Sequence, residues 1–194
     1  MILLRHFRNS PMPITLTALF AACVTAFPLQ GGALDSLPVV QALDLQRYAG
    51  TWYEIARFPN RFQKQCDGEV TATYTLLDDG TVRVVNRCRT DGGEWTEAEG
   101  KARRAREDGP TSILKVRFAP AFLSFLPFVW GDYWVIDLAE DYTYAVIGEP
   151  KREYLWILSR TPVLAEETYA AILHRASAKG FDVSKLVRTR QTPP

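Results

Sequence analysis

The alternation of apolar and polar residues along the chain predicts a sheet of short strands. From Gly50 onward, β-branched and aromatic segments with a two-residue period are separated by turn residues, which is typical of strands. The predicted strands are residues 51–58, 69–77, 81–89, 95–104, 112–118, 132–138, 143–149 and 154–160. Turns such as Asp78-Asp79-Gly80 favour hairpin connections. An all-β fold, an eight-stranded antiparallel up-and-down β-barrel, fits this order better than a sandwich with long crossovers.

The hydrophobic period changes after residue 162. Apolar or small side chains then recur every four residues, at Leu164, Thr168, Ile172 and Ala176. This spacing predicts one C-terminal α-helix that packs outside the barrel and ends at Gly180. A ninth short strand is predicted near residues 183–189. We expect residues 28–46 to form a linker and lead-in, residues 47–190 the barrel domain, and residues 191–194 a frayed tail.

The first 27 residues resemble a secretory signal peptide. Arg5 and Arg8 precede an apolar run, Ile14 to Phe27, that is too short to span a bilayer. Small residues before Cys23 resemble a bacterial lipobox, in which the cysteine is lipidated, and this predicts a lipoprotein of the outer membrane on its periplasmic face. The alternative is cleavage after Ala26, which would leave a soluble periplasmic or secreted protein.

Composition narrows the chemistry that the domain can perform. The formal net charge is +1, and the chain beyond the signal is close to neutral, so nucleic acid is not an expected partner. The two histidines are His6, in the signal, and His174, on the predicted helix. No histidine remains for a metal site, a catalytic triad or a haem ligand inside the barrel. We therefore expect that the protein is not an enzyme and that it binds no metal and no cofactor.

Two of the three cysteines lie in the predicted domain. Cys66 and Cys88 form an even pair in an exported protein, which predicts a disulfide. The bond would attach the loop before residue 69 to the barrel rim. The alternative is that Cys88 is a reactive thiol inside the barrel.

Three motifs in order resemble the lipocalin family. Gly50-Thr51-Trp52-Tyr53-Glu54-Ile55-Ala56-Arg57 resembles the Gly-x-Trp motif of the first lipocalin strand, Asp141-Tyr142-Thr143-Tyr144 the second motif, and Ser159-Arg160 the third. The resemblance is strongest to the bacterial lipocalins and their apolipoprotein D relatives, and it covers residues 43 to 190. It implies structural roles for Gly50, Trp52, Asp141, Tyr142 and Arg160. In particular, the Arg160 guanidinium is expected to stack on the Trp52 indole at the barrel floor.

The resemblance also implies which side chains face the interior. Trp52 points inward in lipocalins, and side chains alternate between the two faces of a strand, so every second residue from Trp52 is expected to point inward as well. The expected ligand-binding set is mostly apolar: Glu54, Ala56, Phe58, Ala72, Tyr74, Val84, Asn86, Val116, Phe118, Tyr133, Val135, Tyr154 and Trp156. Such a lining suits a fatty acid, a lysophospholipid or a similar lipid that is bound, stored or transported. The alternative is that side chains simply fill the barrel. Glu54 is either a structural hydrogen-bond acceptor or a group that reads the ligand.

The segment from Phe118 to Trp130 is more apolar than an exposed loop usually is. It contains two prolines, Pro120 and Pro127, together with Phe122, Phe125 and Phe128. Three interpretations remain open: a flap over the ligand, the surface of a homodimer, or a tip that dips into a membrane already reached through a lipid anchor. The corresponding alternatives to lipid carriage are an enzyme acting on a lipophilic substrate and an envelope-anchored interaction protein. The basic residues 103, 104 and 106 form either a solvated turn or a weak phosphate site.

Overall fold

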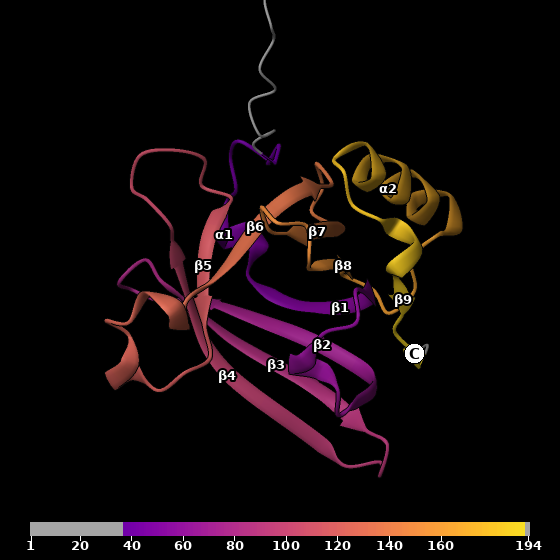
Figure 1. Ribbon diagram of the computed structural model, residues 1–194, viewed down its shortest axis with the longest axis horizontal. Helices are drawn as coiled ribbons and strands as arrows, with labels where there is room; N and C mark the ends of the chain where they lie inside the picture. Colours follow the sequence, from indigo (N-terminus) through magenta and orange to yellow (C-terminus); the bar gives the residue numbers. More distant parts are fainter. Residues whose placement is uncertain (1–36, 193–194) are drawn as a thin grey trace, which may run out of the picture. The chain divides into compact units, whose positions relative to one another are not determined.

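The computed structural model describes residues 37–192, in which one sheet closes into a barrel (Figure 1). The barrel strands are β1 (Gly50–Arg57), β2 (Cys66–Leu76), β3 (Val82–Thr90), β4 (Trp95–Arg104), β5 (Ile113–Arg117), β6 (Gly131–Leu138), β7 (Tyr144–Gly148) and β8 (Leu155–Ser159). Each pairs antiparallel with the next, and β1 pairs with both β2 and β8. The up-and-down barrel predicted from the alternation is confirmed.

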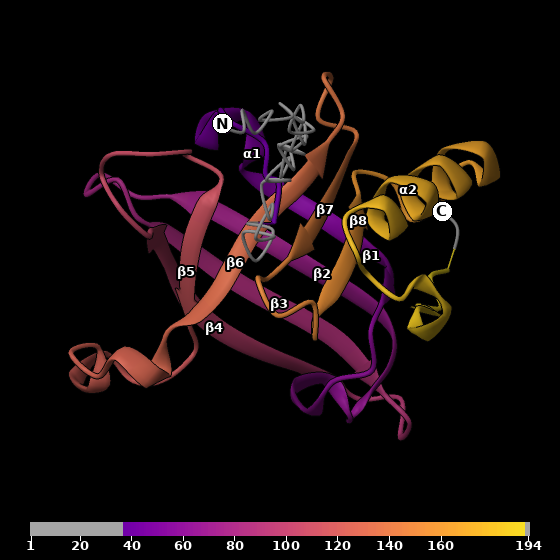
Figure 2. The same cartoon turned by 45° about the horizontal axis from the view of Figure 1, so that its top comes forward.

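The connections alternate between the two ends of the barrel. The connections after β1, β3, β5 and β7 lie at one end, which we call the mouth, and the others lie at the base. Short 3-10 turns occur in two mouth connections: η1 (Arg61–Gln63), η2 (Ala121–Leu123) and η3 (Pro127–Val129). Figure 2 shows the η2–η3 connection extending away from the strands.

The C-terminal helix covers part of the outer face of the sheet, as expected. α2 (Glu166–Ala178) buries Tyr169, Ile172 and Ala176 in an outer cluster that also contains residues of β1, β7 and β8 (Figure 1). Phe181, just beyond the helix, enters the same cluster. A Cβ atom at Gly148 would lie 2.6 Å from the Phe181 ring, so this position requires glycine.

The lead-in to the barrel is packed rather than a linker. α1 (Leu45–Tyr48) is capped by Asp44, whose side chain accepts hydrogen bonds from the main-chain nitrogens of Gln46 and Arg47. Leu37, Leu43 and Tyr48 are buried. The expected linker is therefore wrong for residues 37–46, because these apolar side chains pack against the barrel. Residues 28–36, like the predicted signal and Cys23, lie outside the described residues.

The C-terminal residues complete the barrel wall. β1 pairs with β2 only as far as Tyr53 and Thr71. Beyond that point β9 (Val187–Arg188) pairs with β1, and the main-chain nitrogen of Glu69 in β2 donates to the oxygen of Arg190 at 2.8 Å. We call residues 187–192 the C-terminal seam, because they fill the gap between β1 and β2 on the mouth side.

The seam corrects the expected frayed tail. The side chain of Gln191 donates to main-chain oxygens on both flanking strands, and Thr192 donates from its main-chain nitrogen to Glu69 at 2.9 Å. Residues 191 and 192 are therefore held by hydrogen bonds to distant strands, which local sequence does not reveal. Residues 193–194 lie outside the described part of the chain. Within residues 37–192, no helix has the length and apolar character to cross a membrane.

Candidate functional site

The base of the barrel is closed by a stack of Arg160 on Trp52. The guanidinium carbon lies 3.8 Å from the centre of the indole, which is fully buried. The guanidinium also donates to the main-chain oxygens of Thr51 and Ala49, at 3.0 and 2.9 Å. Gly50 has a φ of +96°, and a Cβ atom there would lie 3.2 Å from Arg160 Nη1. The stack predicted from the sequence is present, and these contacts explain why glycine precedes the tryptophan by two residues.

The second motif forms a turn at the same end. The Asp141 carboxylate accepts hydrogen bonds from the main-chain nitrogen and the hydroxyl of Thr143, which lower the pKa of Asp141. The Tyr142 hydroxyl accepts from the main-chain nitrogen of Asp44 at 3.0 Å, and Arg47 lies 4.0 Å from its ring centre. The turn between β6 and β7 is thereby attached to α1.

Three phenols occupy the interior above this floor. The hydroxyl oxygen of Tyr133 lies 2.7 Å from that of Tyr48 and 2.9 Å from that of Tyr74. Burial raises the pKa of all three phenols, that of Tyr74 to about 12. The inner end of the barrel is therefore lined by neutral hydroxyl groups at ordinary pH.

A β-bulge changes which residues of β1 face the interior. The pairing with β8 shifts between Glu54 and Ala56, so Arg57 lies opposite Trp156 and faces inward. Ala56 and Phe58 belong to the outer cluster beneath α2. The expectation that these two residues line the interior is wrong, because the extra residue in the bulge reverses the alternation that held up to Glu54.

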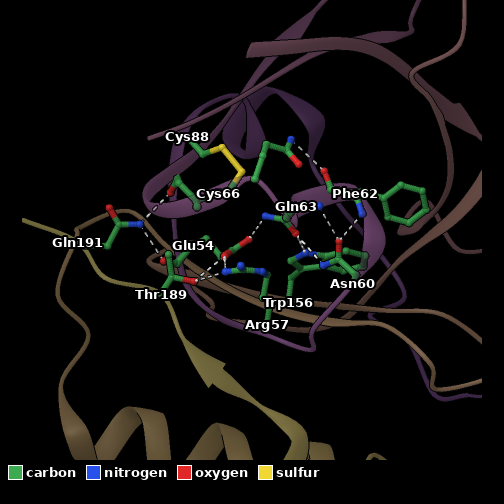
Figure 3. Close-up of a disulfide and its surroundings, with 12 residues drawn as sticks. Glu54, Arg57, Asn60, Phe62, Gln63, Cys66, Cys88, Trp156, Thr189 and Gln191 are labelled. Atoms are coloured by element: carbon green, nitrogen blue, oxygen red, sulfur yellow. Dashed lines mark hydrogen bonds and ion pairs between the residues drawn. A yellow bond between two sulfur atoms is a disulfide. The ribbon is translucent and has the colours of Figure 1, made fainter. Parts of the chain in front are cut away.

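The inward carboxylate of Glu54 has several donors (Figure 3). Its Oε1 accepts from Arg57 Nη1 at 2.8 Å and from the Thr189 hydroxyl, and its Oε2 accepts from Gln63 Nε2 at 2.6 Å. Gln63 Oε1 in turn accepts from Trp156 Nε1 at 2.9 Å. Glu54 is 3% exposed. These contacts favour the structural alternative, since one carboxylate joins β1 to the η1 loop and the seam.

β4 presents only small side chains to the interior. Its inward positions, opposite the inward residues of β3, are Thr96, Ala98, Gly100 and Ala102. Ala98 faces inward and is nevertheless exposed, so solvent reaches the interior at this level. A Cβ atom at Gly100 would lie 2.7 Å from the ring of Phe118, which covers this position. Our sequence interpretation missed this wall, although the strict alternation of residues 95–102 carries the signal.

Aromatic side chains lie on the opposite side of the mouth. The rings of Tyr154 and Trp156 are stacked with centres 5.7 Å apart, and Phe62 of η1 lies 5.8 Å from Tyr154. Phe62 is 57% exposed, so the mouth is rimmed by apolar surface that remains in contact with water.

The predicted disulfide is present at this rim. Cys66 and Cys88 are bonded, with Cα atoms 5.6 Å apart (Figure 3). Cys66 pairs with Thr90 in the register of β2 and β3, so the bond runs diagonally between the two strands. Because both sulfurs are in the bond, the alternative of a free reactive thiol at Cys88 is wrong for this state of the protein.

Comparison with known proteins identifies the family. Residues 43–191 match the lipocalin-like domain family. The chain belongs to the lipocalins. This lipocalin is 47% identical over 161 residues to temperature-induced lipocalin-1 of Arabidopsis thaliana, which covers 81% of the chain and 86% of that protein. It is 43% identical over 188 residues to the outer membrane lipoprotein Blc of Escherichia coli K12, covering 95% of the chain and 98% of that protein.

Solved structures share the same fold. Insecticyanin from the tobacco hornworm Manduca sexta superposes with a TM-score of 0.60 at 22% identity, over 81% of this lipocalin and 85% of that chain. At this identity the likeness concerns the barrel alone.

The apolar connection between β5 and β6 does not cover the mouth of this lipocalin. Phe122, Phe125 and Phe128 are 74%, 77% and 80% exposed. The connection is fixed at its end by Trp130, whose ring lies 4.4 Å from the guanidinium of Arg103 on the outer face of β4. The flap interpretation is therefore wrong for the described structure, because a flap would bury these rings against the interior.

Most of the expected lining does lie together in the lipocalin interior. The residues of the expected set in or packed against the interior cluster are Ala72, Tyr74, Val84, Val116, Tyr133, Val135 and Trp156. Asn86 lies opposite Ala98, and Tyr154 stacks at the mouth. Arg57, Tyr48 and the small residues of β4 were not in that set. Among the described residues, no group of three His, Cys, Asp or Glu side chains is placed to hold a metal ion.

Proposed function

We propose that this lipocalin binds a single-chain amphiphilic lipid, such as a fatty acid or a lysophospholipid, and carries it at the bacterial envelope. The observation that carries the proposal is the wall of β4: its inward side chains are small, and Ala98 is exposed although it faces inward. Side chains that filled the barrel would bury this position. The space favours an occupant with a slender apolar chain.

The distribution of polarity supports the same class of ligand. The interior cluster is apolar except for phenols, whereas charged groups, Glu54 and Arg57, occur toward the mouth. An acyl chain would contact the apolar walls and a polar headgroup would lie near the mouth. The carboxylate of Glu54 is already bonded to three side chains, and Cys88 is in a disulfide, so these two candidates for catalysis have structural roles. We therefore propose a carrier rather than an enzyme.

Attachment to the outer membrane would place the carrier beside its ligand. Bacterial relatives are named outer membrane lipoproteins, and Cys23 follows small residues as in a lipobox. We propose that Cys23 is lipidated and that the barrel lies on the periplasmic face. Cleavage after Ala26 is the alternative, and intact mass of the exported protein distinguishes the two.

The exposed rings of the β5–β6 connection would then contact the bilayer. Three phenylalanines that are at least 74% exposed on one connection favour a nonaqueous partner. A lipid surface is the partner we propose, because it also supplies the ligand. A second copy of the chain is the alternative occupant of the same rings.

Blocking the interior tests the proposed binding. Ala98→Trp would place an indole in the open part of the barrel, while Glu97→Trp puts the same group on the exposed outer face of the same strand. We expect fatty-acid affinity, followed by tryptophan fluorescence, to fall by about tenfold or more in the first variant. The second variant should bind like the parent. Equal binding by both variants, or purified protein that never contains lipid and ignores added fatty acid, would contradict the proposal.

A further inference from the structure

One side of β4 has no neighbouring strand along its mouth-side half. β5 ends at Arg117, which pairs with Lys101, so within residues 37–192 no strand lies beside residues 95–99 on this side of β4. The chain continues from β5 into the β5–β6 connection, which extends away from the strands (Figure 2). We call residues 95–99 the open edge of β4. Such an edge is unusual in a barrel, because closure normally leaves no strand edge free.

The hydrogen-bond register shows which main-chain groups face the open side. Ala105 donates to the oxygen of Ile113 at 2.9 Å, so the odd-numbered residues of β4 face β5. The hairpin at the other end of β4 agrees, since Thr90 of β3 donates to the oxygen of Glu94 at 2.8 Å and the register from there contains no bulge. The residues whose main-chain nitrogens and oxygens point to the open side are Trp95, Glu97 and Glu99.

The open edge is accessible to another chain. Trp95 is 50% exposed, and Glu97, Ala98 and Glu99 are exposed as well. A strand added antiparallel to β4 would form two main-chain hydrogen bonds with each of the three residues that face the open side. Main-chain bonding alone would accept any extended segment, so the side chains of the open edge decide which segment fits.

On the outer face, the open edge carries two carboxylates. Glu99 accepts from Arg83 of β3 at 2.7 Å, and Glu97 lies 3.5 Å from Arg87. The hydrogen bond from Arg83 lowers the pKa of Glu99, so this carboxylate is ionised at ordinary pH. Each bridge uses one carboxylate oxygen, and a carboxylate accepts through both. Basic side chains on an added strand would extend a cross-strand row of alternating charge, whereas acidic ones would lie opposite like charge.

On the inner face, the open edge carries the small side chains of Thr96 and Ala98. Successive side chains of an added strand would alternate between the two faces in the same way. Those that lie opposite Thr96 and Ala98 would cover apolar surface that is now exposed, so apolar side chains suit these positions.

We propose that the open edge of β4 binds an extended peptide segment in which basic and apolar residues alternate. The added strand runs antiparallel to β4, in line with β5, with basic side chains beside Glu97 and Glu99 and apolar side chains beside Thr96 and Ala98. A second copy of the chain fits less well, because two such edges paired antiparallel bring carboxylates opposite carboxylates. This inference goes beyond the proposed lipid binding and does not depend on it.

Blocked peptides test the proposal on the parent protein. Acetyl-Lys-Val-Lys-Val-Lys-amide is the probe, acetyl-Glu-Val-Glu-Val-Glu-amide is its charge control, and binding is followed by the NMR shifts of the β4 amides. We expect the basic peptide to bind about tenfold more tightly than the acidic one, with shifts centred on residues 95–99. Equal affinities of the two peptides, or shifts elsewhere on the protein, would overturn the proposal.

Methylated peptides separate strand addition from attraction between charges. A methyl group on the amide nitrogen of the central lysine removes a donor that faces β4, and we expect affinity to fall by about tenfold. The same methyl group on a valine nitrogen faces away from β4 and should change affinity by less than about twofold. Equal effects of the two methyl groups would show that no strand is added.

Variants of the open edge give a matched comparison. Glu97→Lys combined with Glu99→Lys should reverse the preference, so that the acidic peptide binds more tightly. Glu107→Lys combined with Asp108→Lys changes the net charge equally at the turn between β4 and β5, at the base, and should keep the parent's preference. A basic preference that survives in the first variant would contradict the assignment.

A proline on the edge tests the main-chain contact. Glu97→Pro removes the nitrogen donor on the open side while the bonds to β3 remain, and it should bind the basic peptide less tightly than Glu97→Ala does. If Glu97→Pro does not fold, the methylated peptides make the same test on the parent protein. A parent that dimerises in sedimentation experiments and binds no peptide would assign the edge to a second copy and overturn the proposal. Lipid binding measured on the same samples stands or falls separately.

Discussion

The side-chain amide of Gln191 donates a hydrogen bond to the main-chain oxygen of Glu54, 137 positions earlier, at 2.9 Å. The same amide donates to the oxygen of Val70 at 2.8 Å. One glutamine therefore supplies the two bonds that β1 and β2 do not make to each other on the mouth side of the barrel.

Replacing this glutamine should destabilise the barrel. In Gln191→Ala two partly buried carbonyl groups lose their donors, and we expect the free energy of unfolding to fall by about 1 to 3 kcal/mol in urea titrations. Gln65→Ala, at an exposed position of the β1–β2 connection, is the control and should change it by less than about 0.5 kcal/mol. Equal effects of the two substitutions would mean that the seam contributes little.

Loss of the stack of Arg160 on Trp52 should lower the free energy of unfolding more than loss of the Gln191 side chain does. Arg160→Ala removes the cation–π contact with Trp52 and hydrogen bonds to main-chain oxygens, so we expect a destabilisation of about 3 kcal/mol. Arg160→Lys keeps the charge but not the planar fork and should recover less than half of the loss. Arg106→Ala, at an exposed position near the base, is the control. Thermal unfolding that does not separate Arg160→Ala from this control would contradict the role of the stack.

Stability should fall at alkaline pH because of the buried phenols. The pKa of Tyr74 is about 12 in the folded protein and about 10 in an unfolded chain. The unfolded state therefore loses its proton first as the pH rises, and the stabilisation present below pH 10 disappears between about pH 10 and 12. This group alone should account for about 3 kcal/mol over that range. Tyr74→Phe should show a shallower decline in denaturant titrations, and an unchanged slope would contradict the assignment.

Reduction of the disulfide should weaken the rim. The bond between Cys66 and Cys88 closes a loop of 22 residues, for which chain entropy gives about 3 kcal/mol. The double serine variant should therefore unfold at lower denaturant, and a reducing agent should destabilise the parent protein but not the variant. A reducing agent that destabilises the variant equally would point to another cause.

The exposed rings should govern binding to membranes. Phe125→Asp places a charge on a ring position that is 77% exposed, and we expect binding to phosphatidylglycerol-containing vesicles to weaken by about tenfold or more. Val163→Asp, 59% exposed beside α2, is the matched control and should bind like the parent. A change in oligomeric state without a change in vesicle binding would favour the second copy of the chain over the membrane.

The local sequence pattern was sufficient to predict the strands and the contact at the barrel floor. It was insufficient to predict structure where segments distant in the sequence meet. Alternation predicts the eight strands because each buries one face, and the motif residues identify the contact between Trp52 and Arg160. The bulge after Glu54 has no such signal: Ile55 and Ala56 are both compatible with either face, so the change of register depends on the pairing with β8. Strict alternation from Trp52 therefore predicts that Arg57 points outward, although it faces the interior.

The remaining differences arise from contacts over long sequence separations. Residues 37–46 were interpreted as a linker and lead-in and residues 191–192 as part of a frayed tail, and only the barrel that they contact shows why they are ordered. Conversely, the small inward residues of β4 could have been read from the sequence, since Ala98 and Gly100 alternate with charged residues. An inward set chosen for large apolar side chains leaves out these positions, because their small side chains contribute little to a core.

The C-terminal seam sets the order in which the molecule can be completed. Glu54 and Val70, near the start of the barrel, are bonded to Gln191, near the end of the chain. These contacts have high sequence separation, so their loop-closure entropy is large and they are expected to form late in folding. The base-side half of the wall is closed without these residues, because β1 and β2 pair directly from Gly50 to Tyr53. A chain shortened by its last six residues would therefore be expected to keep a closed floor and to have a lateral opening in the mouth-side half of its wall.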